Sequence, residues 1–162
     1  TDFLEKRMKL FQLDKRLKIK TGSLNRIPFK ENTYETVTCL ERLETLPQPE
    51  AMLSEISRVL KPEGTLILTT WNPRSIPGVS HRIRTRLLKK TQVTSNEGPV
   101  YPLKKGLLKS LLNSHFSILK TYGINLFPNR SAGKLLNLEG FSTVGPLKGL
   151  CRLNVYICRK RA

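Results

Sequence analysis

The chain has 162 residues, of which 38% are apolar, and carries a formal net charge of +17, so its length suits one domain with a core. No apolar run is long enough to cross a bilayer, residues 1–6 show no secretory signal, and three cysteines without a C-x-x-C pair argue against a disulfide scaffold or a zinc site. These exclusions indicate a cytoplasmic protein with reduced thiols and no metal centre.

The first forty residues predict one helix followed by two strands. Residues 3–16 have apolar side chains at helical spacing, and residues 17–21 alternate between apolar and polar side chains as a strand does. A loop follows, and residues 36–40 form a second segment that is rich in β-forming residues.

Residues 50–70 are the most informative segment, because they predict a helix that leads directly into a buried strand. One helical face carries Met52, Leu53, Ile56, Val59 and Leu60. Pro62 and Gly64 end the helix, and residues 65–71 include a continuous apolar run. A helix that leads into a strand apolar on both faces is half of a βαβ unit in a parallel sheet.

The second half of the chain predicts one more helix and two more strands. Residues 91–102 have the composition of a loop, and residues 103–112 form a leucine-rich amphipathic helix. Residues 116–122 and 153–158 form strands, separated by the irregular, glycine-rich residues 123–150. Alternating helices and strands predict an α/β, doubly wound, mostly parallel sheet, and the last two strands predict an antiparallel pair at its edge.

Positive charge is concentrated in the second half of the chain. Residues 1–81 carry a net charge of +3 and residues 82–162 carry +14. Such a field attracts nucleic acid, acidic lipid or a phosphorylated substrate, and a solvated basic surface without a specific partner is an equally weighted alternative. Residues 81–90 hold five basic residues and an apolar side, as expected of a segment that lies on a membrane surface.

Five segments, taken together, resemble the class I S-adenosylmethionine-dependent methyltransferases. They are Asp2, residues 22–29 (G-S-L-N-R-I-P-F), residues 34–37 (Y-E-T-V), residues 43–46 (L-E-T-L) and residues 55–64 (E-I-S-R-V-L-K-P-E-G). The corresponding family pieces read D-x-S, G-D-A-x-x-L-P-F, S-F-D-x-V, L-x-H-L and E-x-x-R-V-L-K-P-G-G. Their order and spacing match over most of residues 1–75, and each piece alone would be a weak signal.

This resemblance implies a Rossmann-like, mostly parallel sheet with an antiparallel terminal strand. It also implies S-adenosyl-L-methionine as cofactor and methyl transfer to a small, anionic or lipid-like substrate, such as a lipid, a quinone precursor or a sugar phosphate. Residues 1–162 would form a single partial methyltransferase domain, with residues 76–102 and 123–150 as substrate-cap insertions.

The resemblance assigns the adenosine part of the cofactor to three residues. Asp2 stands where an acidic residue accepts hydrogen bonds from the ribose hydroxyls, and its alternative role is a helix N-cap. Ser23 stands where the family places the Asp that holds the adenine amino group, and its alternative is an ordinary loop serine. Leu24 matches the residue that packs near adenine.

The resemblance assigns the methionine part of the cofactor to Cys39, Leu40 and Glu41. These residues stand at the end of a strand, at the carboxyl edge of the expected sheet. Glu41 would meet the ammonium group of the cofactor, with a solvated loop acid as the alternative. Thr45 replaces the histidine of the family pattern, so any role of that imidazole is absent.

The substrate pocket falls to Trp71 and Asn72, at the mouth of the expected site, with partly buried packing as the alternative for Trp71. His81 is the weak candidate for a catalytic base, because it lies in the segment that would cover the pocket. No catalytic residue follows from the sequence beyond this candidate.

The sequence contains no G-x-G-x-G, the loop that cradles the amino acid portion of the cofactor in this family. If Asp2 ends the second strand of the family fold, the preceding βαβ unit of about 30 residues is missing. The resemblance therefore implies an N-terminally truncated sheet and an incomplete form of the enzyme.

Two other functions stay open on the sequence. The first is a basic module that binds nucleic acid or a membrane surface without catalysis, although 7% aromatic residues and no recognised motif make nucleic acid the weaker partner. The second is a truncated product without activity. The methyltransferase assignment requires the strand ends near residues 23, 40 and 71 to lie side by side along one edge of the sheet.

Overall fold

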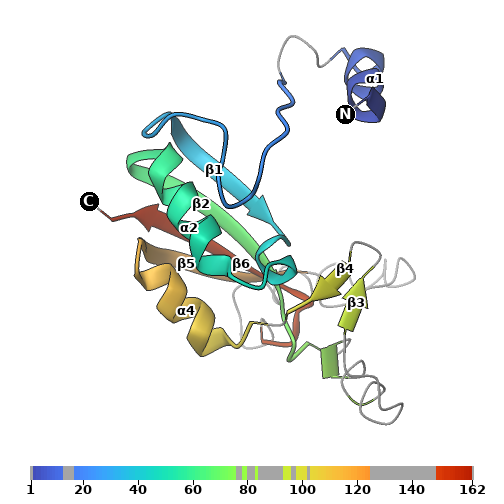
Figure 1. Ribbon diagram of the computed structural model, residues 1–162. Coiled ribbons are helices and arrows are strands. Elements are labelled where there is room, and N and C mark those ends of the chain that lie inside the picture. Colours follow the sequence, from blue (N-terminus) through green and yellow to red (C-terminus); the bar gives the residue numbers. More distant parts are fainter. Residues whose placement is uncertain are drawn as a thin grey trace.

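A computed structural model of the chain describes residues 2–12, 17–75, 78–79, 83, 93–95, 98–101, 103–124 and 149–161. Figure 1 shows a twisted main sheet with helices on one face, a separate small hairpin, and an N-terminal helix that stands apart from the main sheet. None of the described helices is long and apolar enough to span a membrane.

The main sheet is mixed and has the strand order β1-β2-β6-β5. Its strands are β1 (Tyr34–Leu40), β2 (Leu60–Trp71), β5 (Phe116–Ile124) and β6 (Leu153–Lys160). The β1 and β2 strands are parallel, and β6 is antiparallel to both β2 and β5. Three strands therefore point one way and the terminal strand β6 points the other way, which confirms the expected fold class.

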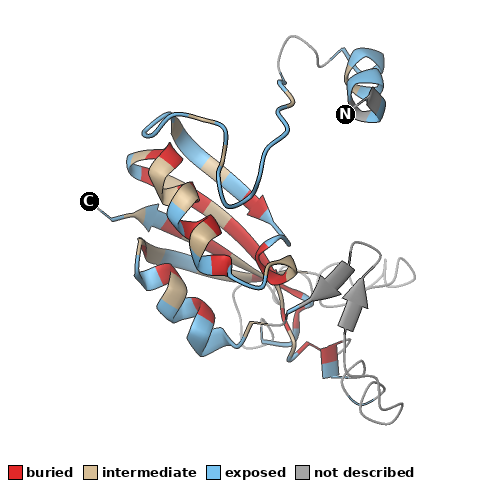
Figure 2. Cartoon of the chain, viewed as in Figure 1, coloured by how far each residue is buried: buried red, intermediate tan, exposed pale blue. Residues whose placement is uncertain are grey.

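Helices α2 (Pro49–Val59) and α4 (Lys105–Asn113) cover one face of this sheet. Their apolar sides meet alternate residues of all four strands in a single core, and Figure 2 shows the buried positions between the two layers. The largest fully buried side chains include Tyr156, Phe116, Leu53, Ile56 and Leu112. Helical spacing in the helices and alternation in the strands direct these side chains to the same interface.

Helix α2 passes into β2 without an intervening loop. The helix ends at Val59 and β2 begins at Leu60, five residues earlier than the sequence predicts. The register jumps from Tyr34↔Leu60 to Thr36↔Thr65, so residues 61–64 bulge out of the ladder. Glu63 has a φ of 62° there. Pro62 and Gly64 therefore shape a bulge inside the strand rather than a turn before it.

The strand predicted over residues 17–21 is absent, and this prediction was wrong. Residues 17–22 have no regular structure, and the nearest ladder contact is an isolated bridge between Ser23 and Arg26. Leu17 is half exposed. Alternation alone cannot stabilise a strand, because its backbone groups need a neighbouring strand, and no described strand lies beside these residues.

Helix α1 (Asp2–Leu10) is shorter than the predicted helix over residues 3–16. Gln12 has a φ of 55°, a left-handed conformation that ends the helix. Residues 13–16 lie outside the described residues. Phe3, Leu10 and Phe11 are exposed, as expected for a helix that packs on no other described element (Figure 2).

The predicted loop over residues 91–102 contains a short antiparallel hairpin, which corrects that prediction. The hairpin consists of β3 (Val93–Ser95) and β4 (Gly98–Val100). Two other predictions cannot be compared with the structure: the basic segment 81–90, apart from Ile83, and the excursion over residues 125–148 lie outside the described residues.

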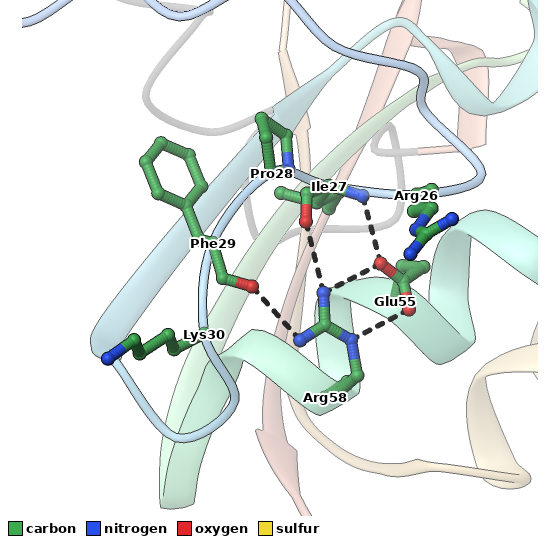
Figure 3. Close-up of a pocket in the computed structure, with 7 residues that line it drawn as sticks. All are labelled: Arg26, Ile27, Pro28, Phe29, Lys30, Glu55 and Arg58. Atoms are coloured by element: carbon green, nitrogen blue, oxygen red, sulfur yellow. Dashed lines mark hydrogen bonds and ion pairs between the residues drawn. The ribbon is translucent and has the colours of Figure 1, made fainter.

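A clamp on α2 holds the segment that precedes β1. The Arg58 guanidinium donates to Oε1 and Oε2 of Glu55, each at 2.8 Å, and to the carbonyls of Phe29 and Ile27, each at 3.0 Å. The backbone N–H of Ile27 donates to Glu55 Oε2 at 2.9 Å. Figure 3 shows these five hydrogen bonds. The guanidinium lowers the pKa of Glu55 to about 2.

We expect the Glu55 clamp to make folding sensitive to acid. Because the folded pKa lies below the ordinary value of 4.5, ionised Glu55 stabilises the fold above that pH, and the contribution is lost as the pH falls towards about 2. Substitution Glu55→Gln should cost about 1 kcal/mol at neutral pH, since the pair is partly solvated. Urea unfolding at pH 6 and pH 3 should show a smaller acid-induced loss in this variant than in the wild type. Equal losses would contradict the prediction.

Candidate functional site

The carboxyl ends of β1 and β2 lie side by side. Leu40 is paired with Thr69, and the backbone N–H of Glu41 donates to the carbonyl of Thr69 at 3.1 Å and to its hydroxyl at 3.0 Å. The predicted neighbourhood of the strand ends near residues 40 and 71 is therefore confirmed. The third predicted strand end, near residue 23, was wrong because the described residues 17–22 before it form no strand.

The three residues predicted to meet the methionine part of the cofactor differ in their exposure. Cys39 is buried against the helices, and burial raises the pKa of its thiol to about 11. Leu40, on the opposite face of β1, is 59% exposed. Glu41 is exposed and has a φ of 50°, which turns the chain away from the sheet. An exposed apolar side chain and an exposed carboxylate thus lie next to each other at this edge.

Glu44 is a polar residue of this edge that the sequence analysis missed. It belongs to the short 3-10 helix η1 (Leu43–Thr45) and is only 3% exposed. Its Oε1 accepts the backbone N–H of Trp71, and its Oε2 has no hydrogen-bond partner among the described residues. Burial raises the pKa of Glu44, and the nearby charge of Glu41 raises it further. The sequence signal was a second acid three residues after Glu41, but spacing alone does not show burial.

Asn72 follows β2 and uses its whole side chain on the backbone. It is 6% exposed, and its Nδ2 donates to the carbonyls of Gly149 and Cys151, both at 2.9 Å. Its Oδ1 accepts the N–H of Arg74 at 3.0 Å. Asn72 therefore joins the end of β2 to the segment that leads into β6, whereas the neighbouring Trp71 is only partly buried.

The β3–β4 hairpin also reaches this edge. Strand β4 lies against η1, and the N–H of Tyr101 donates to the carbonyl of Glu44 at 2.6 Å. Part of the segment 76–102 therefore lies over the ends of β1 and β2. This position agrees with a cap insertion, which stays a prediction for residues 76–102 and 123–150 as a whole.

The other predicted site residues are not brought to this edge in the described structure. Asp2 begins α1, which stands apart from the sheet in Figure 1. The Ser23 hydroxyl accepts the N–H of Asn25 at 3.2 Å within a local turn, and Leu24 is 38% exposed. His81 lies outside the described residues. Their roles stay predictions.

A cavity of about 560 Å³ lies away from this edge, between α2 and residues 26–30 (Figure 3). Its lining includes Arg58 and Glu55, whose charged groups are already hydrogen-bonded to each other and to the backbone. The cavity is therefore a product of the clamp, and we do not assign the active site to it.

Comparison with known proteins connects the N-terminal part of the chain with a known family. Residues 2–68 match the family model described as a methyltransferase domain. This segment of the chain is therefore similar to methyltransferase domains. The mixed sheet described above is the fold shared with solved SAM-dependent methyltransferases.

Two curated methyltransferases illustrate the sequence similarity. The demethylmenaquinone methyltransferase of Lactobacillus johnsonii is 33% identical over 73 residues, which cover 44% of this chain and 30% of that protein. The ubiquinone biosynthesis O-methyltransferase of Xanthomonas oryzae pv. oryzae is 45% identical over 40 residues, which cover 25% of this chain and 17% of that protein. The chain thus spans less than a third of these relatives in the matched regions.

Solved structures share the fold at low sequence identity. A SAM-dependent methyltransferase of Thermotoga maritima superposes on 96% of this chain with a TM-score of 0.65 and 17% identity, covering 70% of its own length. The [4+2]-cyclase SpnF superposes on 98% of this chain with a TM-score of 0.64 and 19% identity, covering 61% of its own length. Because one neighbour is named as a cyclase, the shared fold alone does not define the reaction.

We expect Asn72 to be important for the stability of this domain. Substitution Asn72→Ala would leave the carbonyls of Gly149 and Cys151 without this donor, the second of them in a buried position, at a cost of about 2 kcal/mol in the free energy of unfolding. Urea denaturation followed by the fluorescence of Trp71, the single tryptophan of the chain, measures this change. The matched control Asn113→Ala, at the exposed end of α4, should change the free energy by less than about 0.5 kcal/mol. Equal effects would contradict a special role of Asn72.

Proposed function

We propose that this chain carries the acceptor-side part of an S-adenosylmethionine-dependent methyltransferase, with a small, hydroxyl-bearing, lipid-like molecule as the methyl acceptor. The adjacent carboxyl ends of β1 and β2 are the observation that supports it best. In open α/β sheets, ligands bind at this edge. Here the edge carries Cys39, Leu40 and Glu41, predicted for the methionine part of the cofactor, and the residues predicted for the substrate pocket.

The residues at the edge fit the cofactor chemically. Exposed Leu40 offers an apolar contact for the methionine part of the cofactor, and the exposed carboxylate of Glu41 suits its ammonium group. When bound, the cofactor supplies a methyl group activated on a sulfonium, so the protein needs no nucleophile of its own. The contribution of the chain is to align the two reactants and to exclude water, for which the β3–β4 hairpin beside η1 is well placed.

The acceptor class is inferred from the relatives and from the charge. Their names refer to demethylmenaquinone and to ubiquinone biosynthesis, so both point to quinone-type small molecules. The second name also specifies methylation of an oxygen atom. The positive charge of residues 82–162 favours an acceptor that is anionic or embedded among acidic lipids. A hydroxylated quinone precursor satisfies these conditions.

Binding and turnover test this proposal. We expect S-adenosylhomocysteine to bind the 162-residue chain more weakly than about 10 μM in calorimetry, because the sequence holds no glycine-rich loop to cradle its amino acid portion. With labelled S-adenosylmethionine near 1 mM, slow transfer of the methyl group to catechol should be detectable by mass spectrometry. No transfer to catechol or to other phenols at these concentrations would overturn the proposal, and micromolar affinity would contradict the expected role of the loop.

A second candidate function, binding to an acidic membrane surface, is favoured by one observation. Residues 103–124 and 149–161, which form α4, β5 and β6, contain eight lysines and arginines and no acidic residue. Lys104, Lys105 and Lys109 are exposed on α4, together with Leu107, which is 51% exposed. Clustered cations beside an exposed apolar side chain suit the headgroups of anionic lipids.

We expect the chain to sediment with vesicles that contain phosphatidylglycerol and not with vesicles of phosphatidylcholine alone. Replacing Lys104, Lys105 and Lys109 with Glu should weaken binding by at least about tenfold, since each lysine near the surface contributes about 1 kcal/mol. Replacing Lys6, Lys9 and Lys18 with Glu is the control with equal charge change. Equal losses in the two triple variants would contradict a specific surface, and stronger binding to single-stranded RNA than to vesicles would favour nucleic acid.

A further inference from the structure

We propose that the free carboxylate oxygen of Glu44 receives the hydroxyl group of the methyl acceptor. This inference rests on the proposed function and deepens it, because it assigns an acceptor-binding residue and a chemical class to the acceptor. Neither the sequence motifs nor the relatives assign any role to Glu44.

The first support is an unspent hydrogen-bonding group in a place where it is costly. Glu44 is only 3% exposed, and its Oε2 has no hydrogen-bond partner among the described residues. Native proteins pair nearly all buried polar atoms, because an unpaired one loses its hydration without compensation. An unpaired oxygen at the edge formed by the carboxyl ends of β1 and β2 is explained if a ligand donates the missing hydrogen bond.

The second support is the position of Glu44 between the two groups of predicted site residues. It follows Glu41 by one turn, and its Oε1 is fixed by the N–H of Trp71, the first residue predicted for the substrate pocket. Its carbonyl accepts the N–H of Tyr101, which follows the β3–β4 hairpin. Glu44 lies within η1 and is hydrogen-bonded both to the end of β2 and to the residue that follows the described hairpin of the predicted cap. A ligand between cofactor and cap would meet this carboxyl.

The third support is the chemistry of the carboxyl itself. Its Oε1 already has a donor, so an ionised Oε2 can only accept, and a hydroxyl is the donor that a quinone precursor offers. The ionisable groups that act on each other here are Glu44, Glu41 and the thiol of Cys39 on β1; Arg42 acts on the same thiol, and Tyr101 contributes its backbone N–H to the Glu44 carbonyl. The pKa of Glu44 is raised by burial and by Glu41, so acidification protonates it at a higher pH than an ordinary glutamate and weakens its acceptor strength.

Binding of catechol to the full 162-residue chain tests the inference. Trp71, the single tryptophan, lies beside Glu44, so its fluorescence should report saturable binding of catechol in the wild type. In Glu44→Gln, which keeps an oxygen for the N–H of Trp71, we expect an affinity about tenfold weaker, because a charge-assisted hydrogen bond is lost. The wild-type affinity should rise with pH as Glu44 ionises, at a pH above the ordinary glutamate range, and the affinity of Glu44→Gln should lack this rise.

A control variant and an alternative measurement show whether the effect is specific to Glu44. Glu50→Gln removes an exposed acid from the first turn of α2 and should retain the affinity and pH dependence of the wild type. If Glu44→Gln does not fold, carbon-13 NMR of the wild-type carboxyl groups replaces it. Catechol should then shift the glutamate resonance that titrates above the ordinary range.

Three outcomes would overturn the inference: no catechol binding, equal affinity in Glu44→Gln, or an unchanged Glu44 resonance. Binding of S-adenosylhomocysteine is measured separately and involves other residues. If the cofactor product binds and methyl transfer occurs while Glu44→Gln behaves as the wild type, the inference fails and the proposed function stands. If no phenol is methylated, the proposed function fails whatever the effect of Glu44.

Discussion

Parallel pairing of β1 with β2 is the constraint on which the rest of this structure depends. Because the two strands run in the same direction and share a register from Thr36 to Leu40, their carboxyl ends must emerge at one edge. Helix α2 belongs to the crossover connection between them, and it leads into β2 without a loop. The position of the site therefore follows from the parallel pairing and its crossover connection. The pairing alone brings together the residues that follow each strand.

The edge is stabilised by side chains that form hydrogen bonds with backbone groups of neighbouring segments. Glu44 and Asn72 do this in complementary ways, since one binds the N–H at the end of β2 and the other binds carbonyls that precede β6. Asn72 is fully paired, whereas Glu44 keeps one oxygen unpaired. A stable framework with one unsatisfied group is the arrangement expected where a protein reserves an interaction for a ligand.

Much of this fold was predictable from the sequence because its strongest patterns are long and locally consistent. The helix over residues 49–59 and the apolar β2 agree with their periodicity, and so does α4. The strand over residues 17–21 failed because pairing depends on a neighbour that a local pattern does not reveal. Glu44 was missed for a related reason: the local pattern does not show that this acid is buried, and both its burial and its contact with Trp71 depend on β2. The edge of the site was predictable, and its buried carboxyl was not.

The insertion of β6 between β2 and β5 has a consequence for how the molecule assembles. Leu66 of β2 pairs with Cys158 of β6, and these partners are far apart along the chain. Until residues 153–160 arrive, the apolar flanks of β2 and β5 stay unpaired and able to associate with other chains. Such distant pairing makes folding slow, so yield during synthesis should depend on chaperones and temperature more than the stability of the finished domain does.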